Sequence, residues 1–115
     1  MKNTQTGKIG EKLAKEFLEK QGYKILETNI HFSRNCEIDI IAQDKNTIVF
    51  IEVKTRSSNT CGSPLEAITK TKFNNIKTGV FNYLQEHKFK KFRIDAISII
   101  LKPEISIKHL KNISM

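Results

Sequence analysis

Apolar side chains near the start of the chain recur at the spacing of one helix face, which predicts an amphipathic helix. The apolar stripe consists of Ile9, Leu13, Ala14, Phe17 and Leu18. Gly22 has the position of a residue that ends a helix, because glycine adopts the left-handed backbone conformation found there without strain. At about 100° per residue, Glu11 lies beside Leu18 at the edge of the stripe, so its carboxylate is expected along the boundary of the core.

The chain then changes to short apolar runs that are typical of β-strands. Tyr23 to Ile30 is a mixed run, whereas Glu37 to Gln43 and Thr47 to Val53 are rich in Ile and Val. Asp44-Lys45-Asn46 separates the last two runs and has the composition of a hairpin turn. We therefore expect three strands, of which the second and third form a hairpin.

A second helix is predicted after a polar loop from Ser57 to Gly62. Ser63-Pro64-Leu65-Glu66 has the pattern of a capping box with proline at the first helical position. Gly79 weakens the predicted helix locally. The apolar residues at helical spacing are Leu65, Ile68, Ile76, Val80 and Leu84.

Two further strands complete the pattern, Phe92 to Leu101 and Ile105 to Leu110, with Lys102-Pro103 as the turn before the last one. The order of helix, three strands, helix and two strands predicts a mixed α/β sheet flanked by helices. A chain of 115 residues has the size of a single domain, residues 1–115, which can bury a core without disulfides or structural metal. Residues 1–6 are expected to form a flexible N-terminus.

The charge of the chain is unbalanced, with 20 Lys and Arg against 12 Asp and Glu, a formal net charge of +8. This excess favours polyanions such as nucleic acid, although a merely soluble basic protein has the same balance. No apolar run reaches the roughly 18 residues that span a bilayer, and the first residues lack the apolar core of a secretory signal. Cys36 and Cys61 form neither a metal-binding motif nor a disulfide framework, so free thiols and a cytoplasmic location are expected.

Four charged residues interrupt the two most apolar strands: Glu37, Asp39, Glu52 and Lys54. Strands this apolar are typical of elements buried on both faces, where charged groups are rare unless they are paired or bind metal. If Asp44 pairs with Thr47 across the turn, the antiparallel ladder places Asp39 opposite Glu52 and Glu37 opposite Lys54.

This register puts all four charged side chains on one face of the hairpin. The other face would then carry Ile38, Ile40, Val49, Ile51 and Val53. Two opposed carboxylates repel each other, and a divalent cation removes the repulsion. Mg²⁺ binds one or two carboxylates and leaves positions for water and phosphate, which is the layout of metal-assisted phosphodiester hydrolysis. The alternative is an ordinary ion-pair ladder of Glu37 with Lys54 on a solvated face.

The motifs in combination resemble those of the uncharacterised bacterial YraN family, from Gly7 to Leu110. The matching residues are Gly7, Gly10-Glu11, Ala14, Gly22-Tyr23, Asn29, Glu37-Ile38-Asp39, Phe50-Ile51-Glu52-Val53-Lys54-Thr55-Arg56, Gly62, Ile68-Thr69, Lys72 and Arg93-Ile94-Asp95. That family is similar to the PD-(D/E)XK nuclease superfamily and, within it, to archaeal Holliday-junction resolvases. The resemblance implies a restriction-endonuclease-like fold, with a central mixed four-stranded sheet flanked by helices.

The resemblance also implies roles for four residues. Asp39 corresponds to the metal-binding aspartate, Glu52 to the second carboxylate, and Lys54 to the lysine of the Glu-x-Lys motif. Glu11 corresponds to a glutamate of the first helix that reaches the same site through water or metal. The implied cofactor is Mg²⁺, for which Mn²⁺ could substitute.

Basic residues after the Glu-x-Lys motif are candidates for binding phosphates beside the scissile bond. These candidates are Arg56, Lys70 and Lys72, of which Lys72 also matches the family pattern; for Lys70, a solvated helix face is the favoured alternative. We expect Arg93 and Asp95 to form a structural ion pair. The histidines lack a partner at ligand spacing and are expected at the surface or its boundary: His31, His87 and His109.

The sequence thus predicts a nucleic-acid-binding protein, leaning towards a Mg²⁺-dependent endonuclease that cleaves branched or single-stranded DNA. The alternative from another class is a non-catalytic module that binds DNA or RNA for a repair, recombination or uptake machine. A third hypothesis is a protein-interaction domain that binds no nucleic acid. A homodimer is expected only by analogy with resolvases, which cut two symmetric strands, and no membrane partner is expected.

Overall fold

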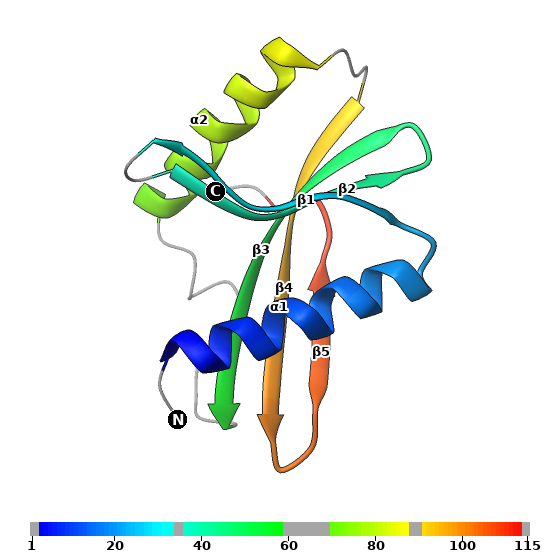
Figure 1. The fold of residues 1–115 in the computed structure, drawn as a ribbon, viewed down its shortest axis with the longest axis vertical. Helices are drawn as coiled ribbons and strands as arrows, with labels where there is room; N and C mark the ends of the chain where they lie inside the picture. The colour runs from blue at the N-terminus through cyan, green and yellow to red at the C-terminus, as the bar shows by residue number, and fades with distance from the viewer. Residues whose placement is uncertain (1–2, 34–35, 59–69, 88–90, 114–115) are drawn as a thin grey trace.

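The computed structural model describes residues 3–33, 36–58, 70–87 and 91–113. Within these ranges it confirms a mixed α/β architecture in the predicted order (Figure 1). The elements are α1 (Asn3–Lys20), β1 (Lys24–Ser33), β2 (Cys36–Asp44), β3 (Thr47–Ser58), α2 (Lys70–Glu86), β4 (Lys91–Lys102) and β5 (Ser106–Leu110).

The strands form one sheet in the order β1-β2-β3-β4-β5. Neighbouring strands are antiparallel except for β3 and β4, which run parallel. A parallel pair needs a long crossover connection, and α2 lies in that connection. The family resemblance implied four central strands, and β5 is a fifth strand at the edge of the sheet.

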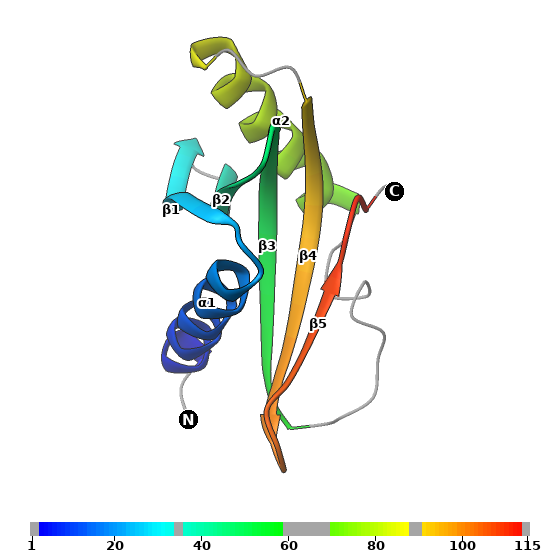
Figure 2. The ribbon, with the colours of Figure 1, turned by 90° about the vertical axis from the view of Figure 1, so that its right-hand side faces the viewer.

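The two helices cover opposite faces of the sheet, as Figures 1 and 2 show. Each face has its own apolar core. The core on the α1 side contains Ala14, Leu18, Tyr23, Ile40, Ala42, Val49, Ile51, Ile97 and Ile99. The core on the α2 side contains Ile38, Ile41, Ile48, Phe50, Phe73, Ile76, Val80, Tyr83, Ile94 and Ala96. Because successive side chains of β3 and β4 enter the two cores alternately, both strands are apolar along most of their length.

The buried stripe of α1 lies further round the helix than predicted. Thr6 and Gly10 are buried, whereas Ile9 is 40% exposed. A Cβ atom at Gly10 would lie 1.6 Å from Thr55 Oγ1, so the helix packs against β3 at a distance that only glycine permits. This close contact turns the small residues inward and Ile9 outward. The helix also begins at Asn3, inside the segment that was expected to be flexible.

The end of α1 has the predicted geometry. Gly22 has a φ of 93°, in the left-handed region. Its N–H donates to Glu19 O, and the N–H of Tyr23 donates to Leu18 O, both at 3.0 Å. This pair of bonds is the Schellman motif, which satisfies carbonyls left free at a helix end.

Other boundaries differ modestly from prediction. β3 continues to Ser58, so Ser57 belongs to a strand and not to a loop. The predicted capping box at residues 63–66, together with Leu65 and Ile68, lies outside the described residues. None of the helices in the described ranges is both long and apolar enough to span a bilayer.

Candidate functional site

β2 and β3 pair in the register that the hairpin turn predicted. Asp44 lies opposite Thr47, and the pairing continues to Ile40 opposite Ile51. The ladder ends there, and in Figure 2 β1 and β2 turn out of the plane of β3 and β4. The next residue of β3 is Glu52, so the site begins where the two strands separate.

Asp39 bonds to β3 through its side chain at this point. The Val53 N–H donates a hydrogen bond of 2.8 Å to Asp39 Oδ2. The alternation of β2 also changes here, because Ile40 packs on the α1 side whereas Ile38 packs under α2. The prediction that these two isoleucines share a face is therefore wrong. The change coincides with Asn29 of β1, whose φ of 52° is left-handed and breaks the regular pleat.

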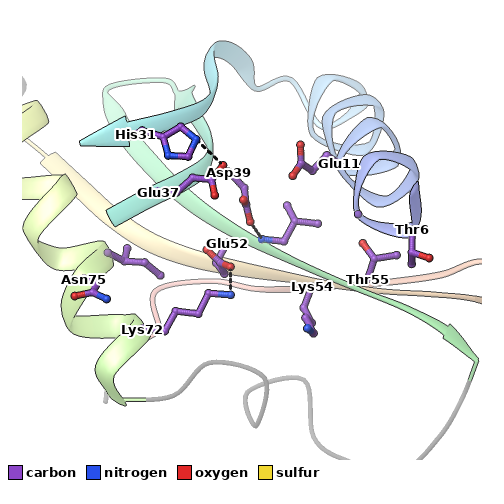
Figure 3. Close-up of a pocket in the computed structure, with 13 residues that line it drawn as sticks. Thr6, Glu11, His31, Glu37, Asp39, Glu52, Lys54, Thr55, Lys72 and Asn75 are labelled. Atoms are coloured by element: carbon purple, nitrogen blue, oxygen red, sulfur yellow. Dashed lines mark hydrogen bonds and ion pairs between the residues drawn. The ribbon is translucent and has the colours of Figure 1, made fainter. Parts of the chain in front are cut away.

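Glu52 lies on the α2 side of β3, and its side chain is only 6% exposed. Lys72 of α2 reaches it, with Lys72 Nζ 2.5 Å from Glu52 Oε1. Figure 3 shows this ion pair at the side of the cleft formed by α2. Nothing in the local sequence marks Lys72 as a partner of Glu52, and only its match to the family pattern singled it out.

The two carboxyl groups are coupled electrostatically. Burial, followed by repulsion from Glu52, raises the pKa of Asp39 to about 8, although the hydrogen bond from Val53 acts in the opposite direction. Burial also raises the pKa of Glu52, against the lowering effects of Lys72 and of a hydrogen bond with Asp39. At neutral pH the pair therefore holds a proton. This is the expected behaviour of adjacent carboxyl groups removed from water.

The cleft around this pair has a volume of about 480 Å³ and is lined by α1, β1, β2, β3 and α2. Glu11 of α1 points into it, and the negative charge of Glu11 contributes to the raised pKa of Asp39. Lys54 also lines the cleft, but its side chain points away from Asp39 and Glu52 (Figure 3). Sequence reasoning brought Lys54 to the carboxylates, whereas in the structure Lys72 makes that contact.

Glu37 lies at the rim of the cleft and is exposed. It pairs with His31 of β1, whose Nε2 lies 3.4 Å from Glu37 Oε1. The alternative of an ion-pair ladder with Lys54 is thus wrong, because β2 has already turned away from β3 at this level. Among the basic candidates, Arg56 is partly buried two residues beyond Lys54, and Lys70 is exposed at the start of α2.

A second polar cluster lies outside the cleft. The predicted ion pair of Arg93 with Asp95 is confirmed, with Arg93 Nε 3.1 Å from Asp95 Oδ1. The prediction that His109 is isolated is wrong, because β5 places its Nε2 2.7 Å from Oδ2 of the fully buried Asp95. Burial alone would raise the pKa of Asp95, but bonds from His109 and the Asn112 N–H and the charge of Arg93 lower it. The cluster holds the C-terminal segment against β4.

The donor groups present are compatible with a divalent metal. Within the described ranges, no three His, Cys, Asp or Glu side chains converge closely enough to form a complete cage. Mg²⁺ does not need one, because it usually keeps several waters and uses one or two carboxylates. Asp39 and Glu52 could supply those carboxylates, with Glu11 reaching the ion through a water. The two carboxyl groups carry a proton and bind a lysine ammonium, so both already compensate their negative charge. A divalent cation could replace that positive charge.

Most residues of the cleft lie in the part of the chain that is similar to known proteins. Residues 10–99 match the profile of the uncharacterised protein family UPF0102. A UPF0102 protein of Syntrophomonas wolfei is 42% identical to this chain, covering 96% of it and 97% of the relative. A UPF0102 protein of Clostridium botulinum is 46% identical, covering 96% and 94%, and one of Dehalococcoides mccartyi is 40% identical, covering 94% and 91%. The similarity therefore extends over nearly the whole of each chain.

Proposed function

This chain belongs to the UPF0102 family, also known as YraN, and for this member we propose a Mg²⁺-dependent endonuclease that hydrolyses phosphodiester bonds in DNA. The proposed substrate is branched or single-stranded DNA, and the proposed location is the cytoplasm. The resemblance to PD-(D/E)XK nucleases supports this reading, because Asp39 and the Glu52-x-Lys54 motif follow that superfamily's pattern on adjacent strands.

The observation that carries the proposal is the contact between Asp39 and Glu52. Adjacent carboxyl groups, here the half-buried Asp39 and the buried Glu52, destabilise a fold, and their raised pKa values express that cost. The fold would be more stable with apolar residues at these positions or with the carboxylates at the surface. Binding of a cation in the cleft explains why the two residues are present although folding does not require them.

The roles of the residues follow from their positions. Bound Mg²⁺ would lower the pKa of a water and stabilise negative charge on the phosphate. Asp39 and Glu52 would hold the ion, and Glu11 would orient a water from the α1 side of the cleft. Lys54 lies on the open side, where its ammonium could bind a phosphate oxygen of the substrate. The net charge of +8 would attract the polyanion over a longer range.

Basic residues near the cleft would fix the register of the substrate. Arg56 continues the line of β3 beyond Lys54, and Lys70 and Lys72 lie on the facing end of α2. Such residues would bind phosphates on either side of the scissile bond without reading bases. The affinity for nucleic acid should therefore fall steeply with salt concentration.

A cleavage assay tests the proposal. Purified protein is incubated with branched, single-stranded and duplex DNA in Mg²⁺, in Mn²⁺ and in EDTA. Asp39→Asn and Glu52→Gln should abolish metal-dependent cleavage, while Glu19→Gln, an exposed carboxylate of α1, should leave it unchanged. Equal cleavage by all variants would mean that the activity arises elsewhere or from a contaminant.

A non-catalytic nucleic-acid-binding module remains the second candidate, and one observation favours it. Lys54 points away from the two carboxylates, so the lysine of the motif is not arranged to act on a water there. For such a module, DNA or RNA binding would weaken with salt, and no divalent metal would produce cleavage.

A further inference from the structure

The third residue of α2, Lys72, reaches into the cleft from the face opposite α1. Its Nζ lies 2.5 Å from Glu52 Oε1, so the ammonium and the carboxylate form a direct charge-assisted hydrogen bond. The lysine side chain is 43% exposed, whereas that of Glu52 is 6% exposed. The ammonium thus joins a buried carboxylate to the open side of the cleft.

This ammonium lies in the field of more than one carboxylate. Burial alone would lower the pKa of Lys72, but the bond with Glu52 and the charges of Glu52, Asp39 and Glu37 together raise it. Lys72 is therefore cationic at any physiological pH. It supplies the positive charge that partly compensates the acidic cluster when no other cation is present.

We propose that Lys72 is an internal cation that holds Glu52 in the metal-free protein and exchanges with the divalent metal. The inference rests on the proposed function, because it assumes that Asp39 and Glu52 form a metal site. An ion bound through Glu52 Oε1 would take the oxygen that Lys72 now occupies, and a divalent ion anywhere on the same carboxylate would repel the ammonium.

The exchange links metal binding to substrate binding. Once Glu52 binds the metal, the Lys72 ammonium at the start of α2 loses its bond with Glu52. Its exposed position then lets it bind a phosphate oxygen of a nucleic acid lying in the cleft. Lys72 would thus contribute to nucleic-acid affinity mainly when the metal is present.

The first test measures Mn²⁺ affinity by titration calorimetry at constant ionic strength. Lys72→Met removes the ammonium and keeps the aliphatic stem, and Lys54→Met removes one charge that lines the same cleft without touching a carboxylate. Lys72→Met should bind Mn²⁺ about 10- to 100-fold more tightly than wild type, the size of one lost hydrogen bond to a charged group. Lys54→Met should shift the affinity by no more than about threefold, the effect of an exposed charge whose side chain points away from both carboxylates.

The second test uses wild-type protein and so does not depend on the folding of a variant. Brief acetylation with an amine reagent, read by mass spectrometry, reports the accessibility of each lysine amine. Adding Mg²⁺ should increase labelling of Lys72, while labelling of Lys54 serves as the internal reference. A Lys72 signal that does not change with Mg²⁺ bound would overturn the exchange.

The outcomes separate this inference from the proposed function. If Mn²⁺ binds wild type, but both variants shift affinity equally and Lys72 labelling is constant, the exchange is wrong and the metal site stands. If only Lys72→Met binds Mn²⁺, the exchange is supported, with Lys72 blocking the site. If neither protein binds Mn²⁺, the metal site and the exchange both fail.

Discussion

Replacing Asp39 by asparagine should stabilise the metal-free protein, although it removes a residue of the proposed active site. The amide has nearly the shape of the carboxyl group. Its oxygen can accept the hydrogen bond from the Val53 N–H, which now goes to Asp39 Oδ2 at 2.8 Å. Its N–H₂ group can donate to Glu52, whereas an ionised Asp39 can only repel it. At neutral pH the substitution therefore removes the free-energy cost of protonating Asp39 on folding and keeps the contacts.

The magnitude follows from the pKa of Asp39. The folded-state value of about 8 lies above the value of 3.8 for an unperturbed aspartate, so folding takes up a proton at neutral pH. Well below pH 4 this group does not affect the free energy of unfolding. As the pH rises towards 8, the free energy of unfolding falls progressively, because folding must take up a proton. Each pH unit in this window corresponds to about 1.4 kcal/mol, so the upper limit at pH 7 is about 4 kcal/mol.

Urea unfolding in EDTA at several pH values tests the argument. The free energy of unfolding of Asp39→Asn should exceed that of wild type, and the difference should widen by about 1 kcal/mol per pH unit between pH 5 and pH 7. Glu19→Gln, on the exposed surface of α1, serves as the control for removing one acidic charge. A variant less stable than wild type, or a difference that does not vary with pH, would show that the Asp39 carboxyl group does not destabilise the fold.

Three further predictions address the fold and the basic surface. Gly10→Ala should lower the free energy of unfolding by about 1–3 kcal/mol in urea titration, because the added methyl group would collide with β3. Gly7→Ala is the control: its Cβ meets nothing within 4 Å, so the substitution should be neutral or slightly stabilising. Asp95→Asn should lower the free energy of unfolding by about 3 kcal/mol, because the fully buried carboxylate accepts bonds from Arg93, His109 and the Asn112 N–H; an unchanged melting temperature would argue against a structural role. Lys70→Ala and Arg56→Ala should each reduce the slope of log affinity against log salt for DNA by about one, and unaltered slopes would exclude direct phosphate contacts.

The β2–β3 register could be predicted because it depends only on local sequence. Pairing of Asp44 with Thr47 across the turn residues Lys45-Asn46 fixes which residues of the two runs face each other, and this pairing is confirmed. Asp39 and Glu52 lie next along the two strands, where the sequence placed them. That much of the site follows from strand geometry.

The remaining parts depend on packing between distant segments. Lys72 meets Glu52 only because α2 crosses the sheet at this height, and no spacing in the sequence encodes that contact. The inward side of α1 is set by Thr55 of β3 against Gly10, which a helical periodicity of apolar residues cannot reveal. Ile38 and Ile40, on either side of Asp39, face opposite sides of the sheet. This change lies beside Asn29 of the neighbouring strand, whose backbone is left-handed.

We propose that Asp39 and Glu52 together bind a divalent cation. A crystal soaked in Mn²⁺ and recorded at the manganese absorption edge shows whether they do. We predict one anomalous peak within ligand distance of both carboxylates, with the Lys72 ammonium displaced from Glu52. Fully ordered side chains without a peak between them, or a peak held by other residues, would show that this pair is not a metal site.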